Sequence, residues 1–203
     1  MRQPNVLTTR SILLSVVLSI IVIAGLSCAN AMASDQNTEV IASGERLVHN
    51  MDCNVCHTPK VFTPQGPQPD SSRLLSGHPS DEKLPTIPEG AISPTGWGGI
   101  FNNSLTAWAG PWGVSFGSNL TPDHKTGIGS WTEEIFVHAM RTGTHVGKAR
   151  AFLPPMPTYS RLTDVELHAI YTYLKSIKPI INAVPEALPP LQPSQQKSDQ
   201  TTK

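Results

Sequence analysis

Two cysteines and a histidine lie close together in the segment "CNVCH", as Cys53, Cys56 and His57. In a helical turn, side chains three and four positions apart lie on one face. Such a turn can present both thiols to the two vinyl groups at the edge of a porphyrin, and the following histidine can place its imidazole under the iron. The spacing therefore predicts one covalently bound haem c, with Cys53 and Cys56 as the tethers and His57 as an axial ligand of the iron.

Other uses of a C-x-x-C pair need features that the rest of the sequence does not supply. A thioredoxin-like redox pair expects a βαβ setting, and no strong parallel strands are evident. Zinc or an iron–sulfur cluster would need further thiolates or histidines at recognisable spacing, and the third cysteine, Cys28, belongs to the N-terminal leader. A disulfide between Cys53 and Cys56 is an alternative, but so small a loop would stabilise the fold little.

The second axial ligand is predicted to be Met156, in the segment "AFLPPMPTYSRLTDVE". Flanking prolines restrict the backbone, so this segment can present a thioether rigidly. The alternative interpretation is a methionine that fills a gap in the core. His145, in "RTGTHVGKAR", is the competing ligand; its other interpretations are an exposed loop residue or a hydrogen-bonding partner of a haem propionate.

The remaining candidates are assigned other roles. Met140 is expected in the core, and Met51 lies too close to the attachment motif to reach the other haem face. His138 and His168 fall inside predicted helices. Arg141 is expected either to meet a haem propionate or to lie at a solvated helix end. The tryptophans expected to cover the haem or to pack the segment after His57 are Trp97, Trp108, Trp112 and Trp131.

The N-terminus has the pattern of a secretory signal peptide. Arg2 and Arg10 precede the apolar run "SILLSVVLSIIVIAGLS", which ends at the A-x-A sites "ANA" and "AMA". Residues 1–33 are predicted to be cleaved after Ala33, which places the protein in the periplasm. The alternative is a retained anchor in the inner membrane. The formal net charge is +0, and no basic stripe is present, so nothing indicates binding to nucleic acid.

The rest of the chain is predicted to be mostly α-helical, with long irregular segments. Three helices are expected, from about Glu39 to Asn50, from Ser130 to Gly143, and from Thr163 to just before Pro179. Ser130 with Glu133, and Thr163 with Glu166, have the spacing of capping boxes.

Residues 34–184 are predicted to form one domain, and residues 185–203 a disordered tail rich in Pro, Gln and Ser. Between residues 58 and 117 no helical period is sustained, and "TGWGGIFNNSLTAWAG" is expected to form a small hairpin that turns at Asn102–Ser104. So long an irregular segment is uncommon in a compact domain unless something else organises it, and a haem would supply that core.

With these motifs the chain resembles a class I c-type cytochrome, from the first helix through "CNVCH" to the methionine loop and the last helix. The resemblance implies a fold of about three helices around a covalent haem, with a long insertion after the attachment motif. It also implies that the first and last helices cross at Gly44, opposite Ile170 and Tyr173. The segments "SNLTPDHKTGIGSWTEEIFVHAMRTG" and "LTDVELHAIYTYLKSIKP" are similar to haem domains in cytochrome subunits of membrane-bound alcohol and gluconate dehydrogenases. Those subunits carry several haem domains, whereas this sequence has one C-x-x-C-H motif.

The expected function is therefore single-electron transfer between redox partner proteins, a dehydrogenase or an oxidase, with no substrate chemistry of the chain's own. A methionine opposite a histidine raises the reduction potential relative to two histidines. Two alternatives stay open. One is a haem-based gas or redox sensor with an open or labile sixth position, and the other is a fixed subunit of a larger dehydrogenase.

Overall fold

The computed structural model describes residues 35–92, 97–145 and 150–190. The predicted signal segment 1–33 lies outside these residues. Residues 35–40 are helical and belong to an N-terminal unit, and residues from Ile41 onward form a second unit, to which the following description applies. Among the described residues, no helix is both long and apolar enough to cross a membrane.

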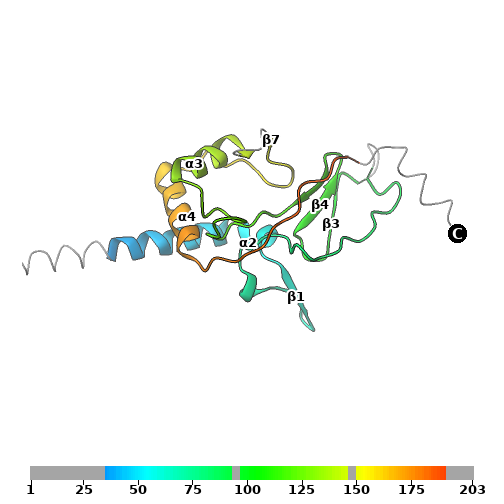
Figure 1. The fold of residues 1–203 in the computed structure, drawn as a ribbon, viewed down its shortest axis with the longest axis horizontal. Helices are drawn as coiled ribbons and strands as arrows, with labels where there is room; N and C mark the ends of the chain where they lie inside the picture. Colours follow the sequence, from blue (N-terminus) through cyan, green and yellow to red (C-terminus); the bar gives the residue numbers. More distant parts are fainter. Residues whose placement is uncertain (1–34, 93–96, 146–149, 191–203) are drawn as a thin grey trace, which may run out of the picture. The chain divides into compact units, whose positions relative to one another are not determined.

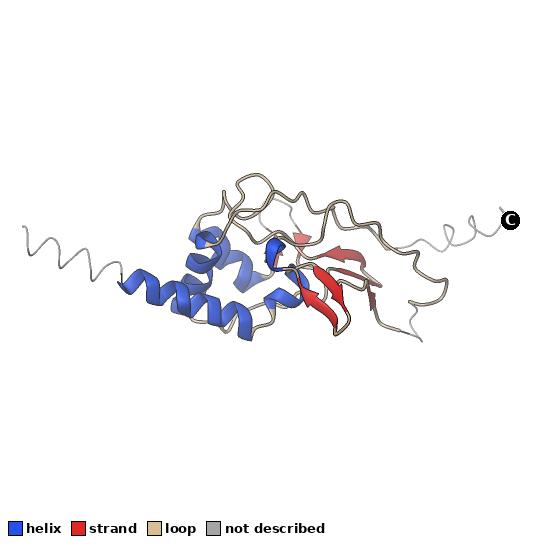
Figure 2. Cartoon of the chain, turned by 90° about the horizontal axis from the view of Figure 1, so that it is seen from below, coloured by secondary structure: helices blue, strands red, loops and turns tan. Residues whose placement is uncertain are grey.

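The second unit is mostly helical or irregular, with short strands, which confirms the predicted fold class. The first helix runs to residue 50. The others are α2 (Cys53–His57), α3 (Glu133–Thr142) and α4 (Asp164–Ser176), with a short 3-10 helix at Ser71–Arg73. In Figures 1 and 2, α2 lies between the α3–α4 pair and the strands β3 and β4.

Local capping rules explain where α4 begins and where α3 ends. Thr163 accepts a hydrogen bond from the Glu166 amide at 3.3 Å, and the Glu166 carboxylate accepts one from the Thr163 amide at 2.8 Å. The predicted capping box is therefore confirmed. Gly143 follows α3 with φ 66°, a left-handed stop that glycine adopts without steric cost.

The predicted start of α3 is wrong by two residues. Its N-cap is Thr132, whose hydroxyl accepts a hydrogen bond from the Ile135 amide at 3.4 Å, and not Ser130. The chain makes a turn just before the helix, in which the Trp131 amide donates to the Ile128 carbonyl at 3.0 Å. Ser130 lies inside this turn, so it cannot also occupy the extended conformation of an N-cap.

The first helix crosses α4 at Gly44. A Cβ atom on Gly44 would lie 2.0 Å from the carbonyl oxygen of Ala169 and 2.7 Å from the Cβ of Tyr173. The expected crossing is confirmed, with Tyr173 opposite as predicted and Ala169, in place of Ile170, as the nearest neighbour. The buried core includes Val48, Leu75, Ile128, Phe136, Met140, Leu167, Ile170, Tyr173 and Leu174.

Seven short strands form three antiparallel sheets in the described residues. They are β1 (Lys60–Thr63) with β2 (Gly66–Pro69); β3 (Ile100–Phe101), β4 (Ala107–Gly110) and β5 (Gly113–Phe116) in that order; and β6 (Thr144–His145) with β7 (Arg150–Ala151). Ile100 pairs with Ala109, so the predicted hairpin around Asn102–Ser104 is confirmed. The Asn102 side chain closes its turn by accepting from the amides of Thr106 and Ala107 at 3.0 and 2.9 Å.

The structured chain continues past the predicted domain boundary at residue 184. The amide and carbonyl groups of Leu188 pair with those of Val114 at 2.9 and 3.0 Å, which holds this segment against β5. Leu188, within the predicted tail, is therefore held by two backbone hydrogen bonds. Residues 191–203 lie outside the described part, and the domain boundaries as a whole stay predictions.

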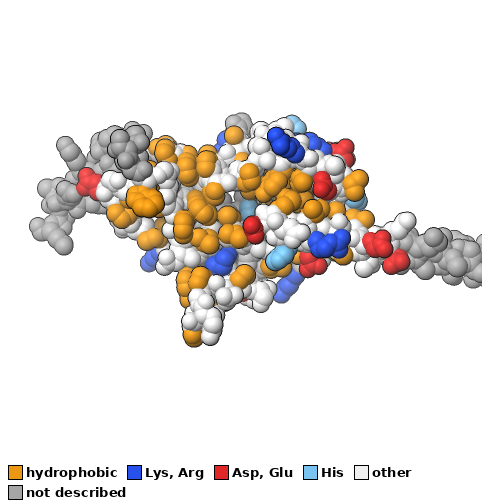
Figure 3. Space-filling model, turned by 180° about the vertical axis from the view of Figure 1, so that it is seen from behind, with side chains coloured by type: hydrophobic (Ala, Val, Ile, Leu, Met, Phe, Trp, Pro, Cys, Tyr) orange, Lys and Arg blue, Asp and Glu red, His pale blue; other side chains and the backbone are white. Residues whose placement is uncertain are grey.

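Figure 3 shows hydrophobic side chains gathered across the middle of one face of the molecule.

Candidate functional site

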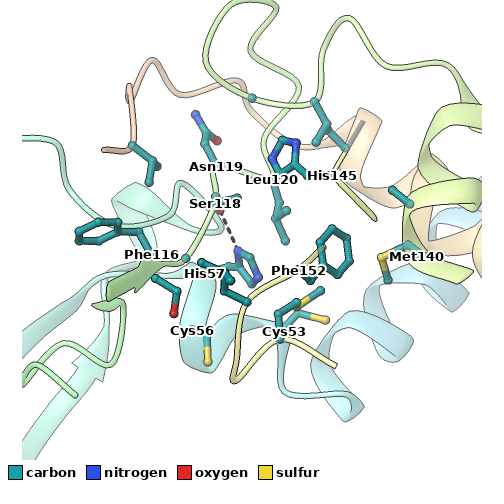
Figure 4. A pocket seen from close by; sticks show the side chains of 18 of the residues that line it. Cys53, Cys56, His57, Phe116, Ser118, Asn119, Leu120, Met140, His145 and Phe152 are labelled. Carbon is teal, nitrogen blue, oxygen red and sulfur yellow. Dashed lines mark hydrogen bonds between the residues drawn. The ribbon is translucent and has the colours of Figure 1, made fainter. Parts of the chain in front are cut away.

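A cavity of about 640 Å³ lies beside α2. Its volume falls within the range of cofactor and ligand pockets. The walls come from α2, the chain after β5, α3, the segment from Arg150 to Tyr159, α4 and residues 183–187. Figure 4 shows Cys53, Cys56 and His57 on one side, and Leu120, Met140, His145 and Phe152 among the other residues around it. Apolar side chains predominate in the wall, as a large apolar cofactor requires.

His57 is held in a fixed orientation at this cavity. Its side chain is 7% exposed, and its Nδ1 atom lies 2.8 Å from the carbonyl oxygen of Ser118. Because a carbonyl can only accept, Nδ1 carries the proton and Nε2 keeps its lone pair, which is the arrangement that orients a metal-ligating histidine. Burial lowers the pKa of His57, with the Ser118 hydrogen bond opposing it, so the neutral imidazole that binds metals is favoured.

Cys53 and Cys56 line the same cavity as His57, and their thiols are not joined in a disulfide. Burial raises the pKa of Cys53 to about 11, and burial likewise raises the pKa of Cys56. Both thiols are therefore protonated near neutral pH. The three residues of the attachment motif are thus brought to one apolar pocket, as their spacing predicts.

Close packing fixes the α2 turn from the side of β5. A Cβ atom on Gly117 would lie 2.0 Å from the carbonyl oxygen of Cys56, so only glycine permits this approach. The carbonyl of His57 accepts a hydrogen bond from the Gly77 amide at 2.7 Å. The Thr58 hydroxyl, which is fully buried, accepts one from the Leu75 amide at 2.9 Å.

Met156 is half-buried and lines the cavity from the segment between β7 and α4. Its amide donates to the Leu153 carbonyl at 3.1 Å, and the neighbouring Pro154 carbonyl accepts from the Ser115 hydroxyl at 2.6 Å. His145 lines the same cavity, with its ring edge-on to Trp131 at 6.0 Å between centroids. Both candidates for the distal ligand are therefore at the site, and the choice of Met156 stays a prediction.

The structure gives Arg141 a role that the sequence did not indicate. Its guanidinium donates to the Asp164 carboxylate at 2.5 Å and to the Ser160 carbonyl at 3.2 Å, so it ties α3 to the start of α4. Arg141 does not line the cavity and lies in the last turn of α3, which is the other position expected for it. Among the described residues, the cations that line it are Lys125 and Arg150, which sequence reasoning missed. Cationic side chains of this kind pair with anionic groups such as carboxylates.

The other sequence candidates fall largely where predicted. Met140 is a core residue, 8% exposed, that also lines the cavity. His138 and His168 lie in α3 and α4, and His168 pairs with Glu133 at 2.9 Å.

Three of the four tryptophans lie at the cavity or beside the strands. Trp108 and Trp131 line the cavity. Trp112 packs closely on Gly110 within the β3–β5 sheet. Trp97 is 74% exposed, so it fits neither of the expected roles.

Comparison with known protein families agrees with this geometry. The cytochrome c family matches residues 41–178, which include the attachment motif, α4 and most of the residues that line the cavity. The chain belongs to the cytochrome c family. Members of this family hold haem c covalently, and the residues of the cavity fit that group: two free thiols and an oriented imidazole at an apolar pocket. Among the described residues, no group of three or more His, Cys, Asp or Glu side chains could hold a metal ion.

The similar curated proteins are subunits of dehydrogenases. The cytochrome c subunit of the quinone alcohol dehydrogenase of Gluconobacter oxydans is 28% identical over 165 residues, or 79% of this chain and 27% of that protein. The cytochrome c subunit of gluconate 2-dehydrogenase of Pantoea cypripedii is 27% identical over 156 residues, 75% of this chain and 27% of that one. The fructose dehydrogenase cytochrome subunit of Gluconobacter japonicus is 34% identical over 93 residues, 44% of this chain and 19% of that one. The chain therefore corresponds to about a quarter or less of each of these relatives.

Proposed function

We propose that this chain is an exported, single-haem c-type cytochrome that passes electrons one at a time between redox partner proteins. Cys53 and Cys56 are its haem tethers, and His57 and Met156 are its axial ligands. The observation that carries the proposal is the placement of both thiols and the Ser118-oriented His57 imidazole around one apolar cavity.

The residues of the chain have three tasks in this function. Bound haem supplies an iron that alternates between the ferrous and ferric states. Cys53 and Cys56 would prevent its loss, and the Ser118 carbonyl holds the Nδ1 side of His57, which would leave Nε2 to bind the iron. Met156, a soft thioether that lines the cavity, would favour the ferrous state as the second axial ligand. With both axial positions held by side chains, no coordination site would be left for a substrate.

A dehydrogenase is the proposed source of electrons. This follows from the relatives, which are named as cytochrome subunits of alcohol, gluconate and fructose dehydrogenases. Export to the periplasm is supported by the leader "SILLSVVLSIIVIAGLSCANAMA", which fits a cleaved signal peptide. If intact mass shows that residues 1–33 are retained, the leader is an anchor and the protein is membrane-bound.

The test is haem retention by the full chain expressed with its leader. After denaturation and acid–acetone extraction, one haem per chain should stay bound, and Cys53→Ala or Cys56→Ala should weaken that retention. Free extraction of haem from the intact protein would contradict the proposal. A native ferrous protein that binds carbon monoxide readily would instead favour the sensor, because its sixth position would then be open.

A further inference from the structure

The side chain of Lys60 donates hydrogen bonds to backbone carbonyls at the C-terminal end of the attachment helix α2. Lys60 is the first residue of β1, three positions after His57. Its Nζ atom donates to the carbonyl oxygens of Val55 at 2.9 Å and of Asn54 at 3.3 Å, and also to that of Thr58. An ammonium group has three donors, so these three contacts use all of them.

The sequence explains why a side chain is needed there. The last carbonyls of a helix have no partner within it, and the amide four positions ahead is the usual donor at its end. Four positions after Val55 stands Pro59, which has no amide hydrogen. The Asn54 carbonyl still receives the Thr58 amide at 3.2 Å. Lys60 therefore supplies to the Val55 carbonyl the donor that Pro59 lacks, and Val55 is one of the two residues between the tether cysteines.

The charge of Lys60 lies close to the haem tether. Its Nζ atom is 2.9 Å from the carbonyl oxygen of Val55 and 3.3 Å from that of Asn54, and these are the two residues between the tether cysteines. Lys60 is only partly exposed. Within the described part of the chain, its ammonium forms no ion pair with a carboxylate, and its hydrogen bonds go to neutral carbonyls.

We propose that Lys60 is a positioning residue of the haem site, which holds the tether turn by its three carbonyl contacts and raises the reduction potential by its charge. The inference rests on the proposed function, since it requires haem on Cys53 and Cys56. Oxidation adds a positive charge at the iron, so a nearby cation makes the ferric state less favourable. Hydrogen bonding and local charge around the ligands are among the means by which a protein sets this potential.

The experiment compares three variants of the full-length holoprotein. Lys60→Met keeps the aliphatic stem but removes the charge and the donors, and Lys60→Arg keeps the charge. Lys83→Met removes an exposed lysine away from the cavity and is the matched control. Potentiometric titration should show a lower potential for Lys60→Met and values near wild type for Lys60→Arg and Lys83→Met. Denaturant unfolding should show a lower midpoint for Lys60→Met than for Lys83→Met.

Two results would overturn the inference. One is a wild-type potential in Lys60→Met, whatever its stability. The other is a decrease of the reduction potential in Lys60→Arg as large as that in Lys60→Met, because the charge of Lys60 would then not be the cause of the decrease. Haem retention after extraction is measured on the same samples. If wild type retains covalent haem and the reduction potential of Lys60→Met equals that of wild type, the inference about Lys60 is wrong and the proposed function stands.

Discussion

The Nδ1 atom of His57 lies 2.8 Å from the carbonyl oxygen of Ser118, 61 residues further along the chain. This hydrogen bond joins the attachment helix to the segment after β5 and leaves Nε2 as the unprotonated nitrogen. A buried, neutral and oriented imidazole is suited to bind iron and unsuited to carry charge. If His57 is the proposed axial ligand, its removal should change the coordination of the iron while the cysteine tethers stay intact.

We expect His57→Ala to keep its haem after acid–acetone extraction but to lose the absorption spectrum of a six-coordinate haem. Its ferrous form should bind carbon monoxide, and imidazole added to the buffer should restore a spectrum close to wild type. His124→Ala is the control, because His124 is exposed and does not line the cavity. A wild-type spectrum in His57→Ala would show that another residue ligates this face.

Gly44→Ala should destabilise the protein, although alanine is the better helix former by about 1 kcal/mol. The new Cβ would lie 2.0 Å from the Ala169 carbonyl oxygen, a backbone atom that cannot rotate away. Separating the two helices should lower the free energy of unfolding by about 1–3 kcal/mol, as overpacking does elsewhere. Denaturant unfolding followed by circular dichroism measures the change.

The matched control for that substitution is Gly98→Ala. A Cβ atom on Gly98 would meet nothing within 4 Å, so this variant should unfold at the wild-type midpoint. If both variants behave alike, the helices do not cross at Gly44 as closely as described.

The features that sequence predicts well here depend on local rules. The Thr163 capping box, the Gly143 stop and the C-x-x-C-H motif each need residues only a few positions apart. Gly44 was also predictable, because a glycine in a helix costs stability unless packing requires it.

Features that depend on distant backbone left no such signal. Any residue type could offer the carbonyl that Ser118 gives to His57. Leu188 likewise pairs with Val114 through main-chain groups alone. Strand β2 was missed because its sequence, "GPQP", contains two prolines, which disfavour strand interiors. Strand β2 pairs only with β1, in a two-stranded hairpin. Every strand of such a hairpin is an edge strand, where proline, which lacks an amide hydrogen, is tolerated.

Asp70 should make stability depend on acid pH. Its carboxylate accepts from the Ser72 hydroxyl at 2.6 Å and amide at 2.9 Å, and from Arg73 Nε at 2.7 Å. These hydrogen bonds, those from Ser72 first, lower the pKa of Asp70 from 3.8 to about 2. Because the folded pKa lies below the unfolded one, the stabilisation is fully present above 3.8 and is lost as pH falls through about 2.

We therefore expect Asp70→Ala to lower the free energy of unfolding by about 1 kcal/mol near neutral pH, which is the usual cost of removing such a cap. The difference from wild type should shrink as pH falls below about 4. Urea unfolding at a series of pH values measures it, with Asp81→Ala as the exposed control. A difference that stayed constant down to the lowest pH would show that the charge of Asp70 contributes nothing.

Met156 is predicted to be the distal ligand in preference to His145, although both line the cavity. A thioether stabilises ferrous iron, so Met156→His should lower the reduction potential, and Met156→Ala should open the iron to external ligands. The weak long-wavelength absorption of methionine bound to ferric iron should disappear in both variants and persist in His145→Ala. Spectra and potentiometric titration of the three holoproteins measure these changes. If His145→Ala loses native ligation while Met156→Ala keeps the wild-type spectrum and potential, His145 is the ligand and Met156 only packs against the core.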